Sequence, residues 1–337
     1  MAGKSGRELV SEKSRDFKSI FFRWETLLVI LFIAVNIMNI SISDKYLSVK
    51  GLFTATNTFL YSAFLVLPMC YILLLGEIDI SVGSIVALSA CSLGIAYNAG
   101  LPMGVAVLVC LLVGTICGMI NGLVLTKFTE LNPMIVTLGS QILFRGIAEM
   151  ILEDQATGGF TNVKWFTDLF WGKIGGVIPY LFVIFVVCAV VFGIIMHKTT
   201  FGRRMYAIGS NRQAALYSGI NVQGIRFTVY TVMGLFSGVT AIFLASQMGS
   251  ARSNVASGFE LTAIGIAVLG GIMSDGGKGN FIGAMIAIFI MGFLQYGLGL
   301  VNVSAQAMLV IKGALLILAV MTPNLLSMRK RRVVKKA

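Results

Sequence analysis

The feature of this sequence that most constrains its fold is a series of long apolar stretches separated by short polar segments. Hydrophobic residues make up 57% of the 337 residues and charged residues only 12%, whereas soluble domains carry about a quarter charged residues. Most stretches reach the ~20 residues that a helix needs to cross a bilayer. Because so few charges cannot cover a water-facing surface of this size, lipid must be the solvent for much of the chain.

The apolar stretches predict helices rather than strands. In hydrocarbon every backbone N–H and C=O group needs an internal partner, so only helices or closed barrels span a bilayer. The stretches are apolar on all faces and lack the alternation of barrel strands. We therefore expect an all-α integral membrane protein with about ten transmembrane helices, some of them short enough to be re-entrant or broken. The expected spans are 27–43, 58–76, 82–98, 102–125, 133–152, 178–197, 227–248, 259–274, 280–300 and 304–323.

Positive charges are unevenly distributed along the chain. The formal net charge is +12, but Lys and Arg gather at the two termini and in segment 198–226, which is typical of cytoplasmic segments rather than of a nucleic-acid site. An even number of helices puts both termini on that side. The sequence thus predicts a cytoplasmic N-terminal segment (1–26), a transmembrane domain (27–323) and a basic cytoplasmic tail (324–337).

Two loops between the expected spans are long. Segment 153–177 is rich in aromatic residues and is expected to face outward, either as an interfacial belt or as a cap for an external partner. Segment 198–226 is too polar to span a bilayer and is expected in the cytoplasm. Within it, Ser210 or Asn211 can cap a helix N-terminus and Gly219 can end the helix, which predicts a short helix of about two turns.

Two carboxylates interrupt an apolar stretch. Glu77 and Asp79 lie in the run 76–84, whose glycines and small polar residues favour a break between two helices, with Ser81 or Asp79 as the cap of the second half. Two interpretations stay open: a tight cytoplasmic turn with solvated carboxylates, or a broken helix that lines a translocation pathway. The run has a short internal echo at 269–279, of the kind found in transporters with repeats.

Other polar residues within the spans also have two interpretations. Arg145 and Glu149 are four residues apart on one helix face, so we expect a structural ion pair, with a role toward a substrate as the alternative. Neutral amides suit an uncharged polyol better than charges do, but they also form hydrogen bonds between helices. The candidate pathway residues are Glu77, Asp79, Ser81, Asn121, Gln141 and Gln295.

No enzyme or metal motif is recognisable in the sequence. It contains no Walker A, His-Glu-x-x-His or Gly-x-Ser-x-Gly pattern. The five cysteines lie inside apolar stretches without the spacing of a metal site or a disulfide framework. We therefore predict no catalytic residue, no metal site and no cofactor in this chain, so the energy for any transport must come from elsewhere.

Several stretches, taken in order, resemble the ribose-type branch of ABC importer permeases. The resemblance covers the chain from about residue 27 to 322. It is carried by Gly-Glu-Ile-Asp-Ile-Ser-Val-Gly-Ser at 76–84 and by the stretches 202–220 and 269–283. The stretches 132–139, 197–199, 215–218 and 249–253 are most similar to autoinducer-2 permeases of the D type, and rhamnose-type permeases are similar around 249–258. The family usually has Gly-Gly-Ile-Asp at 76–79, so the extra carboxylate of Glu77 marks a distinct substrate or a degenerate subunit.

The resemblance implies a permease subunit in the bacterial inner membrane that moves a small sugar or sugar-like solute, such as autoinducer-2, ribose or rhamnose, by alternating access. The implied partners are a second permease subunit, identical or a sister chain, cytoplasmic ATPase subunits that hold ATP and Mg, and an extracytoplasmic solute-binding protein. The short helix in 198–226 matches the family's coupling helix, which docks on the ATPase. The residues implied in this contact are Arg203, Arg204, Gly209, Asn211, Arg212, Ala214, Ala215, Ser218 and Gly219.

Three other functions remain open from the residues alone. An ion- or proton-coupled secondary transporter would use Glu77, Asp79 or the Arg145/Glu149 pair as its coupling site. A passive scaffold would pair with an active sister permease and would tolerate substitution of either carboxylate. An intramembrane enzyme would need a catalytic constellation at one depth, and the sequence offers none.

Overall fold

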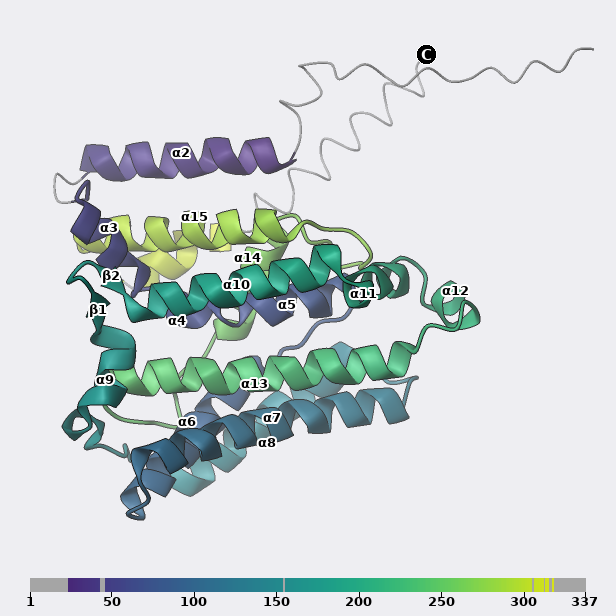
Figure 1. Cartoon of the computed structure of the whole chain (residues 1–337), viewed down its shortest axis with the longest axis horizontal. Coiled ribbons are helices and arrows are strands. Elements are labelled where there is room, and N and C mark those ends of the chain that lie inside the picture. Colours follow the sequence, from purple (N-terminus) through teal and green to yellow (C-terminus); the bar gives the residue numbers. More distant parts are fainter. Residues whose placement is uncertain are drawn as a thin grey trace, which may run out of the picture.

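The computed structural model describes residues 24–42, 46–153, 155–304, 306–311, 313–314 and 317. Most of the expected N-terminal segment 1–26, half of the expected last span 304–323 and the whole basic tail 324–337 lie outside the described residues. The rest forms a bundle of roughly parallel helices, with smaller elements at its two ends (Figure 1). The expectation of an all-α membrane protein is confirmed for the described part of the chain.

Six described helices are long and apolar enough to cross a bilayer. Each begins and ends within a few residues of a span expected from hydropathy. They are α2 (Trp24–Ile42), α7 (Met103–Lys127), α8 (Pro133–Leu152), α10 (Tyr180–Lys198), α13 (Val222–Met248) and α15 (Phe281–Leu300). Several begin at an asparagine: the side chain of Asn132, for example, accepts a hydrogen bond from the Met134 amide at the start of α8.

Two expected spans are broken or shorter than expected, whereas the span expected at 82–98 is present in full. The stretch expected at 58–76 forms α4 (Leu60–Ala63) and α5 (Val66–Leu74), and α6 (Val82–Asn98) follows after an irregular run. The stretch expected at 259–274 forms only α14 (Phe259–Leu269). At 1.5 Å per residue its 11 residues extend about 16 Å, roughly half the thickness of the hydrocarbon core.

Segment 249–258, which joins α13 to α14, enters the bundle from the end where α13 stops. Its start pairs with the loop before α9 through a backbone bridge between Thr157 and Ala251, and Thr157 lies against Gly94 of α6. Its later part reaches Gly83 at the start of α6, where the carbonyl of Ala256 lies 2.6 Å from the position a Cβ atom would take. These two glycines are about 16 Å apart along α6, so segment 249–258 is re-entrant.

The two ends of the bundle carry different elements (Figure 1). At one end lie α3 (Val49–Thr56), η1 (Phe160–Asn162), α9 (Lys164–Trp171) and a two-stranded antiparallel sheet of β1 (Lys173–Ile174) and β2 (Ile178–Pro179). This α9 end buries three aromatic rings and exposes two tryptophans: Phe160, Phe166 and Phe170 are buried, and Trp165 and Trp171 are exposed. At the other end lie α11 (Thr200–Ser210) and α12 (Arg212–Tyr217), so we call it the α12 end.

Helices α7 and α13 approach each other closely along their lengths. Gly114 and Gly118 on α7 face Gly234 on α13, and a Cβ atom at Gly234 would lie 2.7 Å from the Cα atom of Gly118. Without side chains at the crossing the two backbones touch, which is the usual way that helices approach closely in membranes. This contact fixes α13 at the centre of the bundle, next to the helices that carry the candidate residues.

Candidate functional site

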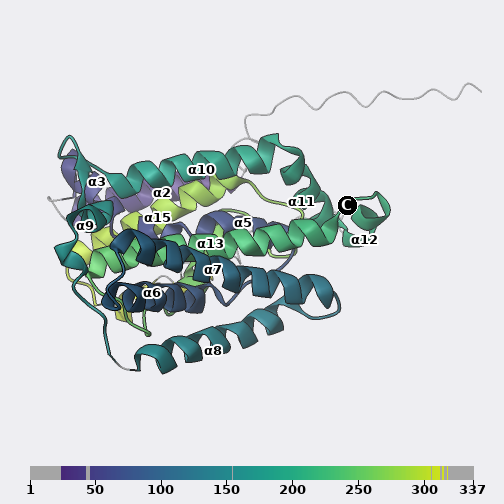
Figure 2. The same ribbon diagram turned by 60° about the horizontal axis from the view of Figure 1, so that its bottom comes forward.

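The short helix expected in segment 198–226 is present as α12. The side chain of Asn211 accepts a hydrogen bond from the Ala214 amide at 3.0 Å and so caps its N-terminus, and Gly219, with a φ of +77°, follows its end. In Figures 1 and 2 the helix projects beyond the ends of the long helices. Ala214 and Ser218 are exposed on it, and Ala215 faces the protein.

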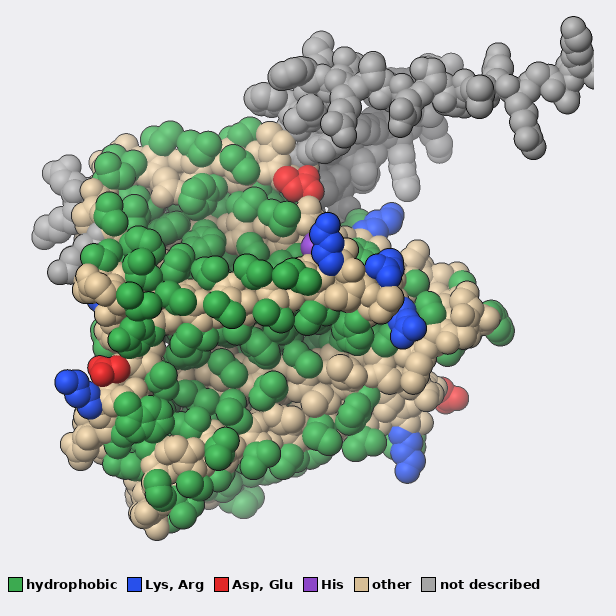
Figure 3. Space-filling view, viewed as in Figure 1, with side chains coloured by type: hydrophobic (Ala, Val, Ile, Leu, Met, Phe, Trp, Pro, Cys, Tyr) green, Lys and Arg blue, Asp and Glu red, His purple; other side chains and the backbone are tan. Residues whose placement is uncertain are grey.

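The surface of the α12 end is cationic around an apolar tip. Arg203 and Arg204 are exposed on α11, and most of the Lys and Arg side chains visible in Figure 3 lie at this end. Leu216 and Tyr217 project from α12, and Tyr217 is 89% exposed. Neither was among the predicted contact residues. The signal available in the sequence was an aromatic residue, Tyr217, in a polar loop. Only the structure of α12 shows that this side chain points outward.

Glu77 is buried and lies between two arginines. Its Oε1 atom is 2.6 Å from Nε of Arg226 and 3.7 Å from Nη1 of Arg212. Glu77 is 7% exposed and Arg226 only 1%. Arg226 also donates a hydrogen bond from Nη1 to the carbonyl of Leu125, near the end of α7. The carboxylate of Glu77 therefore belongs to a buried ion cluster and not to a solvated turn.

Asp79 anchors a second polar group at the start of α6. Its Oδ1 atom accepts hydrogen bonds from the amide of Ser81 at 2.9 Å and from the Ser81 hydroxyl at 2.6 Å. The side chain of Asn121 on α7 donates to Ser81 Oγ at 2.8 Å, and Ser140 on α8 donates to Asn121 Oδ1 at 2.7 Å. The structure thus brings three predicted residues together and adds Ser140.

Gln141 belongs to a separate group at the start of α14. Its amide donates to Oε1 of Glu260 at 3.4 Å, and the amide of Gly258 donates to the same atom at 3.2 Å. Glu260 is 6% exposed and lies in the first turn of α14, where the helix dipole favours a negative charge. Glu260 was not among the candidate residues predicted from the sequence, although an acidic residue at the start of an apolar stretch was a visible signal.

Arg145 holds the re-entrant segment. Its Nη1 atom donates to the carbonyl of Ser253 at 2.5 Å and to the carbonyl of Val255 at 2.8 Å. Within the described part of the chain, the ion pairs closer than 4.0 Å are the two that Glu77 makes. The expected pair of Arg145 with Glu149 is therefore not formed there, and Glu149 is exposed on α8.

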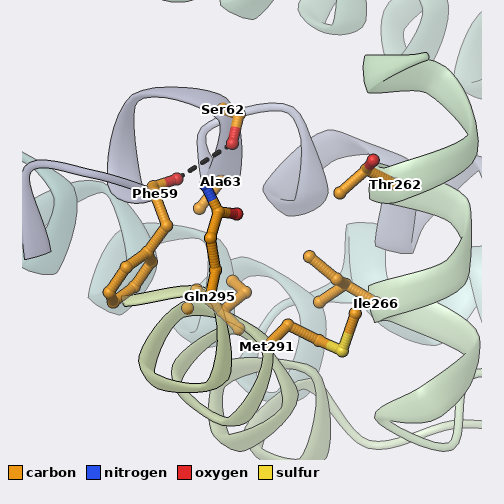
Figure 4. A pocket seen from close by; sticks show the side chains of 9 residues that line it. Phe59, Ser62, Ala63, Thr262, Ile266, Met291 and Gln295 are labelled. Atoms are coloured by element: carbon orange, nitrogen blue, oxygen red, sulfur yellow. Dashed lines mark hydrogen bonds between the residues drawn. The ribbon is translucent and has the colours of Figure 1, made fainter. Parts of the chain in front are cut away.

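Gln295 lies apart from the other candidates, in a pocket between α4, α14 and α15 (Figure 4). The lining of the pocket contains polar groups but no charged side chain. Gln295 points toward Ser62 and Ala63, with Thr262 across the pocket. The complete lining is Phe59, Ser62, Ala63, Thr262, Ile266, Ile288, Met291, Gly292 and Gln295.

The described residues contain no cluster of three or more His, Cys, Asp and Glu side chains suited to a metal ion. All five cysteines are free, and four of them are buried. The polar groups of the bundle are carboxylates, amides, hydroxyls and three buried or half-buried arginines, which hold helices together and can bind hydroxyl groups. They do not form a nucleophile–base pair.

Comparison with known proteins gives a consistent result. The family described as "Branched-chain amino acid transport system / permease component" matches residues 51–320. Proteins named "Autoinducer 2 import system permease protein LsrD" from Escherichia coli strain K12 and from Shigella flexneri are each 36% identical over 306 residues. The match covers 89% of this chain and 92% of each relative. No solved structure matches the chain significantly.

Proposed function

Because the chain belongs to the family of permease components of branched-chain amino acid transport systems, we propose that it moves a small sugar or sugar-like solute as the permease of an ATP-driven importer. It is a transport subunit and a multi-pass protein of the bacterial inner membrane. The relatives named for autoinducer-2 import favour that solute or a related monosaccharide, such as ribose or rhamnose. ATP and Mg belong to a partner ATPase.

The observation that carries the proposal is α12. A short helix projects from the bundle at the end where cations gather, and its tip exposes Leu216 and Tyr217. Positive segments stay in the cytoplasm, so the α12 end faces the ATPase. With about ten spans in the chain, both termini lie on this same side. An exposed aromatic residue on a projecting helix is the kind of group that anchors a protein interface.

A second permease subunit and a solute-binding protein complete the proposed importer. The binding protein would approach the α9 end, on the opposite side of the membrane from α12. ATP-driven closure of the ATPases would displace α12, and the helices would rock between two open states. The candidate ATPase contacts remain those predicted from the sequence, with Leu216 and Tyr217 added and with Arg212 left out, because its guanidinium turns toward Glu77.

The pocket at Gln295 supports an uncharged solute. Ser62, Thr262 and Gln295 offer neutral donors and acceptors, and Phe59 offers an apolar ring face. A polyol needs such groups along its path, whereas a charged solute would need an opposite charge in the lining. We propose that Gln295 is on the translocation pathway, together with the groups around Asp79, Ser81, Asn121 and Gln141.

The test is uptake by proteoliposomes that contain this chain, its partner permease and its ATPase, with the binding protein outside and ATP inside. Radiolabelled ribose, rhamnose and autoinducer-2 are compared in parallel. We expect uptake of at least one of them only with hydrolysable ATP. Uptake by this chain alone, driven by a proton or sodium gradient, would instead establish the secondary-transporter function.

A variant at the tip of α12 separates docking from folding. Because Tyr217 is exposed, Tyr217→Ser should leave the unfolding temperature unchanged and weaken binding of the ATPase about tenfold. Phe128→Ser is the matched control, because Phe128 is an exposed aromatic residue at the same end but outside α12. Equal ATPase binding by both variants would contradict the docking role of α12.

A further inference from the structure

Glu77 connects three segments that are far apart in the sequence. It lies in the irregular run between α5 and α6, Arg212 is the first residue of α12, and Arg226 lies in the first turns of α13. Arg226 is almost fully buried and therefore requires a negative partner, which Glu77 supplies at 2.6 Å. Arg226 also donates a hydrogen bond to the Leu125 carbonyl, which fixes the position of its guanidinium group.

Arg212 reaches the same carboxylate from outside the bundle. Its side chain is 36% exposed, and its Nη1 atom lies 3.7 Å from Glu77 Oε1. Because Arg226 already holds the carboxylate in place, the contact with Arg212 ties α12 to a fixed point in the bundle. A displacement of α12 beyond the reach of the Arg212 side chain must therefore either break this ion pair or move Glu77.

The second half of α11, which leads into α12, also lies directly on α5 and on the loop between α14 and α15. A Cβ atom at Gly209 would collide with the carbonyl of Leu74, which accepts a hydrogen bond from the amide of Gly277 at 2.8 Å. Tyr206 on α11 donates from its hydroxyl to the carbonyl of Gly279 at 2.8 Å. This part of α11 thus contacts the last residue of α5 and the loop between α14 and α15.

The chain beyond Glu77 leads straight to the polar group at the start of α6. Asp79 is two residues away and is bonded to Ser81, which is connected through Asn121 on α7 to Ser140 on α8. These bonds are buried or half-buried and join three helices. A shift of Glu77 therefore reaches α6, α7 and α8 through a continuous set of short contacts.

We propose that Glu77 is a positioning residue that transmits movement of α12 to the start of α6 through its ion pair with Arg212, while Arg226 holds its carboxylate. The inference rests on the proposed function, because movement of α12 matters only if a motor acts on it. It assigns Glu77 a role different from contact with the solute: the carboxylate faces two arginines instead of the pocket at Gln295.

The first experiment measures the link without any partner. Amide hydrogen exchange of residues 209–218 is followed in detergent for the parent chain and for Arg212→Gln, Arg212→Lys and Lys127→Gln. Because Arg212→Gln removes the ion pair, it should speed amide exchange about fivefold. The exchange rate of Arg212→Lys should lie between those of Arg212→Gln and the parent chain. Lys127→Gln removes an exposed charge at the same end and should leave exchange within twofold of the parent.

The second experiment measures coupling in the reconstituted importer. Arg212→Gln should lower the amount of solute moved per ATP hydrolysed by about fivefold or more while ATP hydrolysis continues, and Arg212→Lys should restore part of it. A residue with only a structural role would lower transport and hydrolysis together, in proportion to the folded protein. Arg212 suits this test because its loss leaves the buried Glu77–Arg226 pair intact.

Three results would decide against the link. Unchanged exchange in Arg212→Gln would show that the ion pair does not hold α12, and an unchanged ratio of solute to ATP would show that it does not transmit movement. Glu77→Gln combined with Arg226→Met removes both buried charges, and a fully coupled double variant would also overturn the proposal. A different outcome would be altered exchange in Arg212→Gln together with no ATP-driven uptake by the parent importer. It would overturn both the proposed function and the coupling role of Glu77, and only the structural ion pair would remain established.

Discussion

Arg145 lies on α8 and uses one nitrogen atom to hold two carbonyl groups of the re-entrant segment. A charge at membrane depth is costly unless a partner or a polar backbone group faces it. Here the partners are the carbonyls of Ser253 and Val255, which the irregular segment leaves without helical partners. Arg145 therefore stabilises the segment that precedes α14.

This arrangement predicts different effects for two neighbouring substitutions. Arg145→Leu should lower the free energy of unfolding by about 1–3 kcal/mol, because it leaves two carbonyls without a donor. Glu149→Gln should change it by no more than about 0.5 kcal/mol, because Glu149 is exposed and not ion-paired with Arg145. Denaturant unfolding in detergent measures both. If Glu149→Gln were as damaging as Arg145→Leu, an ion pair would hold the helix instead.

The helices differ in how they are fixed in the bundle. α7 and α13 touch through their backbones, whereas α14 is short and packs against α5 and α15. The short helices α4 and α5 pack against α13. Half-length helices and irregular segments within a bundle are typical of transporters, where they form solute sites. The tight α7–α13 pair gives the shorter elements a firm support.

The α7–α13 contact predicts a strong effect of a single methyl group. Gly234→Ala should lower the free energy of unfolding by about 1–3 kcal/mol, because the added Cβ atom would meet the backbone of α7 and force the helices apart. Gly104→Ala on α7 should stay within about 0.5 kcal/mol, because no other atom lies within 4 Å of the added group. Thermal unfolding in detergent compares the two. Equal effects would show that the helices are not in backbone contact.

The whole molecule has two chemically different ends. The α12 end carries most of the visible cations and the projecting helix, and the α9 end carries aromatic residues and the small sheet (Figures 1 and 3). Lys and Arg are retained on the cytoplasmic side, and tryptophans prefer the interface between membrane and water. The orientation proposed above follows from this difference.

Cysteine labelling in cells tests the orientation. Ser210→Cys introduces a thiol at an exposed position of the α12 end, and Asn162→Cys does the same at the α9 end. A membrane-impermeant maleimide should label Asn162→Cys in intact cells and Ser210→Cys only after permeabilisation. The parent chain is the blank, because four of its cysteines are buried and the fifth is half-buried. Labelling of Ser210→Cys in intact cells would reverse the topology and remove the basis for ATPase docking at α12.

Local patterns in the sequence were enough to predict the six long spans of the described residues, the all-α membrane class and the short helix α12. Hydropathy marks a spanning helix because the bilayer acts on each stretch separately, and Asn211 and Gly219 set the ends of α12 through bonds to nearby residues. The end of α14 could not be predicted in this way. The apolar run continues to Met273, but the structure places Met273 in a loop that contacts α5 and α11.

The partners of buried charges were decided only by the tertiary structure. Arg145 and Glu149 share a helix face in sequence, yet Arg145 contacts Ser253 and Val255, and Glu77 meets Arg226 from a distant helix. The physical reason is that a spanning helix is set by its own hydropathy, whereas a buried charge is satisfied by whichever group the packing of several helices brings within about 3 Å. That packing depends on contacts such as Gly118 with Gly234, which no single stretch of the sequence contains.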